Sequence, residues 1–67
     1  MQYIRDLNNR LIGRIDNEHS GNITARDANG QIIGRYDKGM NATIDRSGRK
    51  LYNGNMVETL IHNNANK

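Results

Sequence analysis

The sequence predicts an all-β protein in which three β-hairpin repeats form a six-strand, strongly coiled meander, followed by a short C-terminal α-helix. The first observation is a repeat: RDLNNRLIGRID at residues 5–16 returns as RDANGQIIGRYD at residues 26–37, and a weaker copy, IDRSGRKLYNGN, occupies residues 44–55. The second is spacing, because the repeated aspartates recur after 21 and 18 residues. This length suits two short strands and their turns.

Each copy is predicted to be one β-hairpin. The hairpins are expected at about residues 2–16, 23–37 and 41–54. In the second copy, Asp27 opens the turn and Gly30 closes it, as in a type I turn followed by a left-handed residue at a bulge. Asn9 and Gly48 take the closing place in the other copies, and both residue types tolerate positive φ.

Gly13 and Gly34 occupy the same place in the second strand of the first two copies. A glycine weakens a strand unless a bend or a close backbone contact requires it. We therefore expect the sheet to coil sharply at these positions.

Regular pairing beyond the turn places Ala25 opposite Ile33 and Ile23 opposite Arg35. One predicted face then carries Ile4, Ile12, Ile23, Ala25, Ile33, Thr43 and Leu51. The other carries Tyr3, Leu11, Ile15, Ile32, Tyr36, Ala42, Ile44 and Tyr52. Neither face is plainly polar, so both are expected to be partly covered.

After the last strand, the apolar residues that recur at helical spacing are Met56, Val57, Leu60 and Ile61. Asn55 can cap this segment, and Glu58 three residues later fits a capping-box-like arrangement. The helix is expected from Met56 to about His62. Since so short a helix is not stable alone, its apolar stripe must lie on the sheet or on another subunit.

With 67 residues, the chain is one domain, residues 1–67, and its core is thin because Leu, Ile, Val and Phe number only 13. Disorder is the alternative at this composition. The chain has no cysteine, so a disulfide or a cysteine zinc site is excluded. Oligomerisation is the remaining common source of stability, and we expect a homo-oligomer, with a dimer as the first choice.

The net charge of +3 comes chiefly from arginine, whose planar group suits phosphate and carboxylate. The bias falls short of a nucleic-acid-binding arm, so nucleic acid is an improbable partner. No apolar run approaches the ~20 residues that span a bilayer, and no charged-then-apolar leader is present. We expect no membrane association and a cytoplasmic location.

The repeat pattern D-x-[NS]-[NG]-[RQ]-x-[IL]-G-R resembles the β-flower type of small hairpin-repeat protein found in bacteria and their mobile elements, over about residues 2–55. The stretch NATIDRSGRKLYNGNMVETLI at residues 41–61 also resembles the ending N-x-T-x-D-x-x-G-R…G-N-x-L-x-x-L-I of short plasmid and phage proteins. It departs at Met56 and Val57, where one leucine is expected nearby, and at Tyr52, where the repeat's glycine is absent. The resemblance implies a hairpin-repeat fold and a phage or plasmid setting, and it brings no catalytic residues.

The candidate ligand-binding residues are Arg14, Arg35, Arg5, Arg26, Tyr36 and Asn53. Arg14 and Arg35 hold the same repeat position, which is Asn53 in the third copy, and Arg5 and Arg26 form a second equivalent pair. Arginines related by a repeat can converge around an axis and clamp a phosphate or carboxylate. The alternative is that they are strand residues balanced by nearby aspartates.

Three tyrosines form a second candidate feature. Tyr3, Tyr36 and Tyr52 share one predicted face, so their rings can offer a stacking wall to a base or nicotinamide. The alternative is that the rings belong to the core, since the chain has neither Phe nor Trp.

No pattern of catalytic or metal-binding residues is present. His19 and His62 lack any ligand spacing, so we expect neither a metal nor another cofactor. The serines lie in turns, and the aspartates recur as turn openers rather than as a catalytic pair. We therefore expect a non-enzyme.

Two functions remain. The first is a small homo-oligomeric binding protein that sequesters an anionic nucleotide-derived ligand or immune signal. If a phage encodes it, it would act as an anti-defence protein. The alternative is a protein–protein interaction module, an inhibitor or adaptor, that docks through its apolar sheet face and C-terminal helix.

Overall fold

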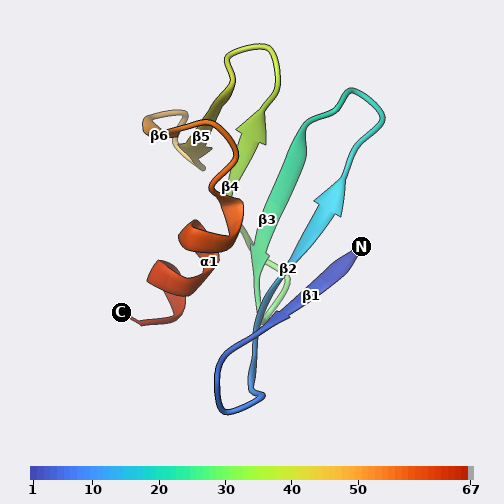
Figure 1. The fold of residues 1–67 in the computed structure, drawn as a ribbon, viewed down its shortest axis with the longest axis vertical. Helices are drawn as coiled ribbons and strands as arrows, with labels where there is room; N and C mark the ends of the chain where they lie inside the picture. Colours follow the sequence, from blue (N-terminus) through green and yellow to red (C-terminus); the bar gives the residue numbers. More distant parts are fainter. Residues whose placement is uncertain (67) are drawn as a thin grey trace.

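The computed structural model describes residues 1–66 as an antiparallel sheet of six strands with one helix laid against it (Figure 1). The elements are β1 (Gln2–Arg5), β2 (Leu11–Asn17), β3 (Ile23–Asp27), β4 (Ile32–Asp37), β5 (Ala42–Asp45), β6 (Lys50–Asn53) and α1 (Val57–Ala65). Each strand pairs with its neighbour in sequence, which confirms the six-strand meander and the C-terminal helix. The sheet is neither strongly curled nor closed, so the predicted strong coiling is wrong.

The three hairpin turns share one set of hydrogen bonds, which the second turn illustrates. The Asp27 N–H donates to the carbonyl of Gln31 at 2.9 Å, and the Gly30 N–H donates to the carbonyl of Asp27 at 3.0 Å. The Asp27 carboxylate accepts from the backbone N–H groups of Asn29 and Gln31, each at 2.9 Å. The residues that close the turns have φ values of 63° at Asn9, 87° at Gly30 and 94° at Gly48. The predicted left-handed turn residues are therefore confirmed.

Gly30→Val should lower the free energy of unfolding by about 1–2 kcal/mol, because a β-branched residue is strained at positive φ. Asn9→Gly, at the equivalent place, should be neutral or slightly stabilising. Urea unfolding of both variants checks this. Equal midpoints for Gly30→Val and the parent protein would show that the turn does not constrain this residue.

Beyond each turn, the strands carry a β-bulge. Ala25 lies opposite Gly34 and Ile23 lies opposite Tyr36, so the predicted pairing is wrong by one residue. Equivalent register shifts occur between Ile4 and Arg5 and between Thr43 and Ile44. Each of these bulges lies further along the returning strand than the bulge that the left-handed residue forms at the turn itself.

The bulges redistribute the predicted faces, because a one-residue shift reverses the side chains that follow it. Ile15, Tyr36 and Tyr52 lie on the helix side of the sheet, as Ile4 and Ala25 do, although these three residues were predicted on the opposite face. Tyr3 pairs with Arg14 and lies on the other side of the sheet.

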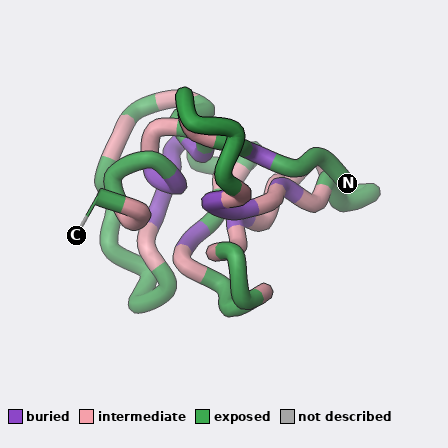
Figure 2. Tube along the Cα trace, turned by 90° about the horizontal axis from the view of Figure 1, so that it is seen from below, coloured by how far each residue is buried: buried purple, intermediate pink, exposed green. Residues whose placement is uncertain are grey.

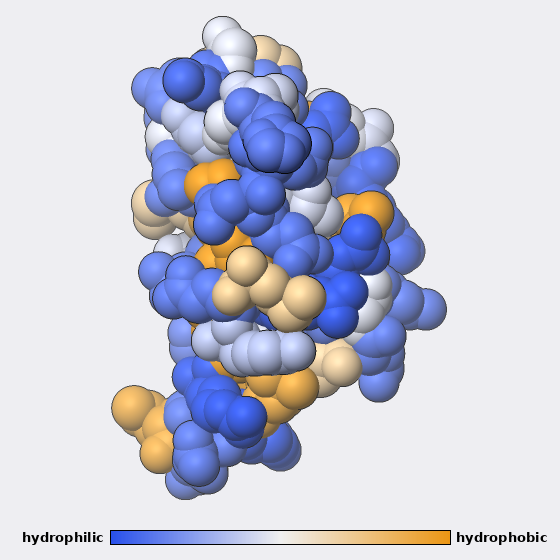
Figure 3. Space-filling model, turned by 90° about the vertical axis from the view of Figure 1, so that its right-hand side faces the viewer, coloured by the Kyte–Doolittle hydropathy of each residue, from blue (hydrophilic) through white to orange (hydrophobic). Residues whose placement is uncertain are grey.

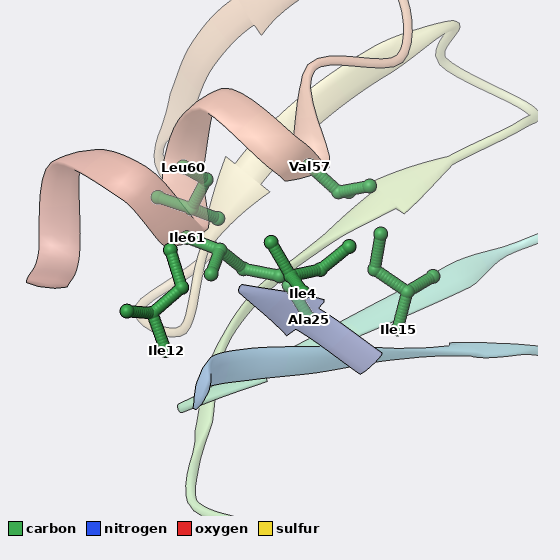
Figure 4. Packing of buried hydrophobic residues seen from close by; sticks show 7 residues of the cluster. All are labelled: Ile4, Ile12, Ile15, Ala25, Val57, Leu60 and Ile61. Carbon is green, nitrogen blue, oxygen red and sulfur yellow. The ribbon is translucent and has the colours of Figure 1, made fainter. Parts of the chain in front are cut away.

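The core lies between the sheet and α1, as Figure 4 shows. Its buried members are Ile4, Ile12, Ile15, Ala25, Val57, Leu60 and Ile61. Along the chain, buried residues lie where the sheet meets the helix and in β5, at Ala42, Thr43 and Ile44, whereas the hairpin turns are exposed (Figure 2). The apolar stripe of the helix is therefore covered by its own sheet.

Gly13 and Gly34 lie directly beneath the helix. A Cβ atom on Gly13 would lie 2.5 Å from the carbonyl oxygen of Arg26 and 2.7 Å from a methyl group of Ile61. One on Gly34 would lie 2.5 Å from the carbonyl oxygen of Ile44 and 2.6 Å from Leu60. These glycines therefore permit the close approach of neighbouring backbone and helix, rather than the coiling that was predicted.

The start of α1 is fixed by a strand residue. The Thr43 side chain is fully buried; its hydroxyl donates to the carbonyl of Gly54 and accepts from the N–H of Met56, both at 2.8 Å. Asn55 makes only a long 3.4 Å bond to the N–H of Val57, and Glu58 makes no capping bond. The helix therefore starts one residue later than predicted and continues to Ala65, beyond the predicted end. No helix in residues 1–66 is long and apolar enough to cross a membrane.

Candidate functional site

The face of the sheet opposite α1 carries a row of four paired residues. Strand pairing aligns Tyr3 with Arg14, Arg14 with Arg26, and Arg26 with Ile32. Tyr3 is 57% exposed and Ile32 is 45% exposed. We call these four residues the arginine row. On the side of the molecule that Figure 3 shows, the surface is largely hydrophilic, with apolar residues in patches among the polar ones.

Two guanidinium groups in this row share one carboxylate. Asp16 Oδ2 lies 3.2 Å from Arg26 Nε and 3.7 Å from Arg14 Nε. Arg26 Nη1 also donates to the carbonyl of Gly30 at 2.8 Å, whereas Arg14 Nε is buried and has no hydrogen-bond partner in residues 1–66. The cluster therefore holds two positive charges against one negative charge.

The remaining predicted ligand-binding residues lie elsewhere. Arg35 pairs with Thr24 and Ile44 on the same face, in a different row, and forms no ion pair within the described part of the chain. Arg5 donates to the carbonyl of Asn9 at 3.2 Å, beside the first turn.

Tyr36 and Asn53 are also separate from the arginine row. Tyr36 faces the helix, and its hydroxyl donates to Asn41 Oδ1 at 2.8 Å. Asn53 lies on the edge strand β6, opposite Ala42. Of the six predicted residues, the structure brings together Arg14 and Arg26. An axis of converging arginines is absent from residues 1–66 because the sheet is open.

The three tyrosines do not form one wall. Tyr36 and Tyr52 flank Thr43 on the helix side, whereas Tyr3 is on the opposite face. Tyr52 stands where the other two copies have glycine, and its hydroxyl oxygen accepts from Asn63 Nδ2 at 2.8 Å. Tyr52, the residue that departs from the repeat, thus contacts the C-terminal part of the helix.

A groove of about 490 Å³ opens between the second turn, the third turn and α1. Its lining residues are Asp27, Gln31, Ile33, Asp45, Arg46, Ser47, Arg49, Leu51, Tyr52, Leu60, Asn63 and Asn64. None of the predicted ligand-binding residues belongs to it. Sequence reasoning missed it because three segments distant in sequence meet there; the available signal was Leu51, an apolar residue immediately after the charged third turn.

The formal charges of the groove balance, since its lining includes two aspartates, Asp27 and Asp45, and two arginines, Arg46 and Arg49. The Ser47 hydroxyl, which donates to Asp45, and the backbone N–H of Arg49 lower the pKa of the Asp45 carboxyl below its ordinary value. Asp45 is therefore ionised at neutral pH, and its Oδ2 lies 3.5 Å from Arg49 Nε.

No protein-family model matches the chain, and no curated protein or solved structure is significantly similar to it. The resemblance to β-flower hairpin repeats therefore stays a prediction from motifs. Within residues 1–66, no group of three or more His, Cys, Asp or Glu side chains is arranged to hold a metal ion.

Proposed function

We propose that this chain is a small non-enzymatic binding protein that holds an anionic, nucleotide-like ligand on the arginine row. The observation that carries the proposal is the pair Arg14 and Arg26 with Asp16 as their shared carboxylate. An incoming phosphate or carboxylate can accept hydrogen bonds from guanidinium N–H groups that the carboxylate leaves free. It would also balance the surplus positive charge.

The ends of the row suit the rest of such a ligand. Tyr3 is directly opposite Arg14 and mostly exposed, so its ring can stack on a planar base beside the bound anion. Ile32 provides exposed apolar surface beside Arg26. Arg35, on the same face, adds positive charge that attracts the anion from solution.

A homodimer belongs to the same proposal. The helix stripe is covered within the chain, so a second copy is not needed to bury it. The remaining apolar reason for association is the set of exposed apolar side chains, which are Met1, Tyr3, Leu7, Ile32, Met40, Leu51 and Met56. Static light scattering at micromolar concentration should give twice the 7.6 kDa chain mass; a folded protein at the mass of one chain contradicts the dimer.

The alternative function, a protein interaction module, is favoured by Tyr3, Arg14 and Arg26 of the same row, because aromatic residues and arginine are enriched at binding hot spots. Its docking surface would be the sheet face opposite α1, since the buried apolar residues of α1 already pack against the other face.

Thermal unfolding with AMP, inorganic phosphate and adenosine tests the ligand proposal. AMP at about 100 times its dissociation constant should stabilise the protein by about 2.7 kcal/mol. Arg14→Met should remove the response to AMP, because it deletes one guanidinium and retains an apolar stem. Arg35→Ala should weaken it through the loss of one nearby charge.

Arg10→Met is the matched control, since Arg10 is an exposed arginine in the first turn that pairs with Asp6. It should keep the full response to AMP. If neither AMP nor phosphate stabilises the parent protein, or if Arg10→Met and Arg14→Met respond alike, the arginine row is not an anion site.

A further inference from the structure

The groove beneath the C-terminal part of α1 has an apolar floor. Ile33 and Leu60 belong to the packing between sheet and helix, and Leu51 extends that surface toward solvent. Leu51 is 37% exposed, which is high for a leucine that borders a core. A ligand seated there would cover apolar surface that water now contacts.

Carboxamide groups line the groove beside this floor. Asn63 uses Nδ2 for its bond to Tyr52, which leaves its Oδ1 as an acceptor. Gln31 and Asn64 make no side-chain hydrogen bonds within residues 1–66. A carboxamide offers a donor and an acceptor side by side, and this pattern matches the edge of a nucleobase.

The charge of the groove selects against a strongly ionic ligand. Its arginines and aspartates balance, and Arg49 is already paired with Asp45. An anion would gain no net attraction there and would lose hydration, whereas an uncharged ligand avoids that cost. The groove volume of about 490 Å³ lies in the usual range of small-ligand sites.

We infer that this groove is a second binding site, separate from the arginine row, and that it takes an uncharged nucleoside. The base lies over Leu51 and the other apolar floor residues. The carboxamides of Gln31, Asn63 and Asn64 contact its polar edge. The site does not depend on the proposed anion site, because it lies on the helix side of the sheet.

Chemical-shift mapping by NMR with adenosine, guanosine, cytidine and uridine tests the inference. At least one nucleoside should shift the amide resonances around Gln31, Leu51 and the side chain of Asn63, and leave those around Arg14 unchanged. Leu51→Ala should weaken that binding about tenfold, which corresponds to about 1.4 kcal/mol. Gln31→Met should reduce the preference among the four bases.

Leu7→Ala is the matched control, because Leu7 is a fully exposed leucine in the first turn, outside the groove. It should bind the nucleoside as the parent protein does. The inference is overturned if no nucleoside shifts groove resonances, if Leu51→Ala and Leu7→Ala have equal affinities, or if binding requires the phosphate of AMP and is lost in Arg14→Met.

Discussion

Gly34→Ala should lower the free energy of unfolding by about 2–3 kcal/mol, although it adds one methyl group. The new Cβ would lie 2.5 Å from the carbonyl oxygen of Ile44, 2.6 Å from Leu60 and 3.3 Å from the Cα of Asp45. The leucine side chain can rotate away, but the backbone of β5 cannot move without breaking its pairing with β4. The pairing of β4 with β5 must therefore be distorted to admit the methyl group.

Gly39→Ala is the control for this prediction. Gly39 lies in the exposed loop between β4 and β5, and a Cβ there would meet only Asp37 Oδ1, at 3.3 Å. Chemical denaturation should give a midpoint near that of the parent protein for Gly39→Ala and a much lower one for Gly34→Ala. Similar midpoints would mean that the helix does not rest on Gly34 in solution.

Thr43→Val should cost about 2–4 kcal/mol, because it leaves the N–H of Met56 and the carbonyl of Gly54 without their hydroxyl partner. Valine has nearly the same shape, so packing is preserved and the loss isolates the hydrogen bonds. Thr43 is 0% exposed, so water cannot replace them without opening the structure. Calorimetric melting measures the effect.

Thr24→Val provides the comparison, since Thr24 is also a strand threonine and its hydroxyl donates to Glu18 at an exposed site. It should cost less than about 1 kcal/mol. Hydrogen exchange should also accelerate at Met56 in Thr43→Val and not in Thr24→Val. Unchanged exchange at Met56 would contradict the assigned role of Thr43 at the start of the helix.

The turns were predictable from sequence because their determinants are local. An aspartate followed three residues later by Gly30 or its equivalents defines both the hydrogen bonds and the positive φ. The second bulge in each returning strand, at Ile12, Ile33 and Leu51, was harder to predict, since an aliphatic residue fits both a regular pair and a bulge. Without this bulge, the prediction assigned Ile15 and Tyr36 to the wrong face of the sheet.

The helix shows a second limit on what could be predicted from the sequence. Its apolar spacing predicted a helix on the sheet, but its first residue depends on Thr43, which is 13 residues from Met56. For the ligand-binding residues, repeat equivalence suggested that Arg14 and Arg35 act together. Equivalent residues in an open meander lie on successive hairpins and need not meet. The cross-strand neighbour of Arg14 is instead Arg26, from a different repeat position.

The position of α1 also bears on how the chain folds as it is synthesised. Every strand pairs with the preceding one, so the sheet can form progressively as the ribosome delivers each hairpin. The helix packs against β2, β3 and β4, and Ile61 rests over Gly13, which was made much earlier. Until α1 leaves the ribosome, Ile4, Ile12 and Ile15 face water or a chaperone. Synthesis of α1 is therefore the event that covers this side of the sheet, and a variant truncated before Val57 should form an aggregation-prone sheet.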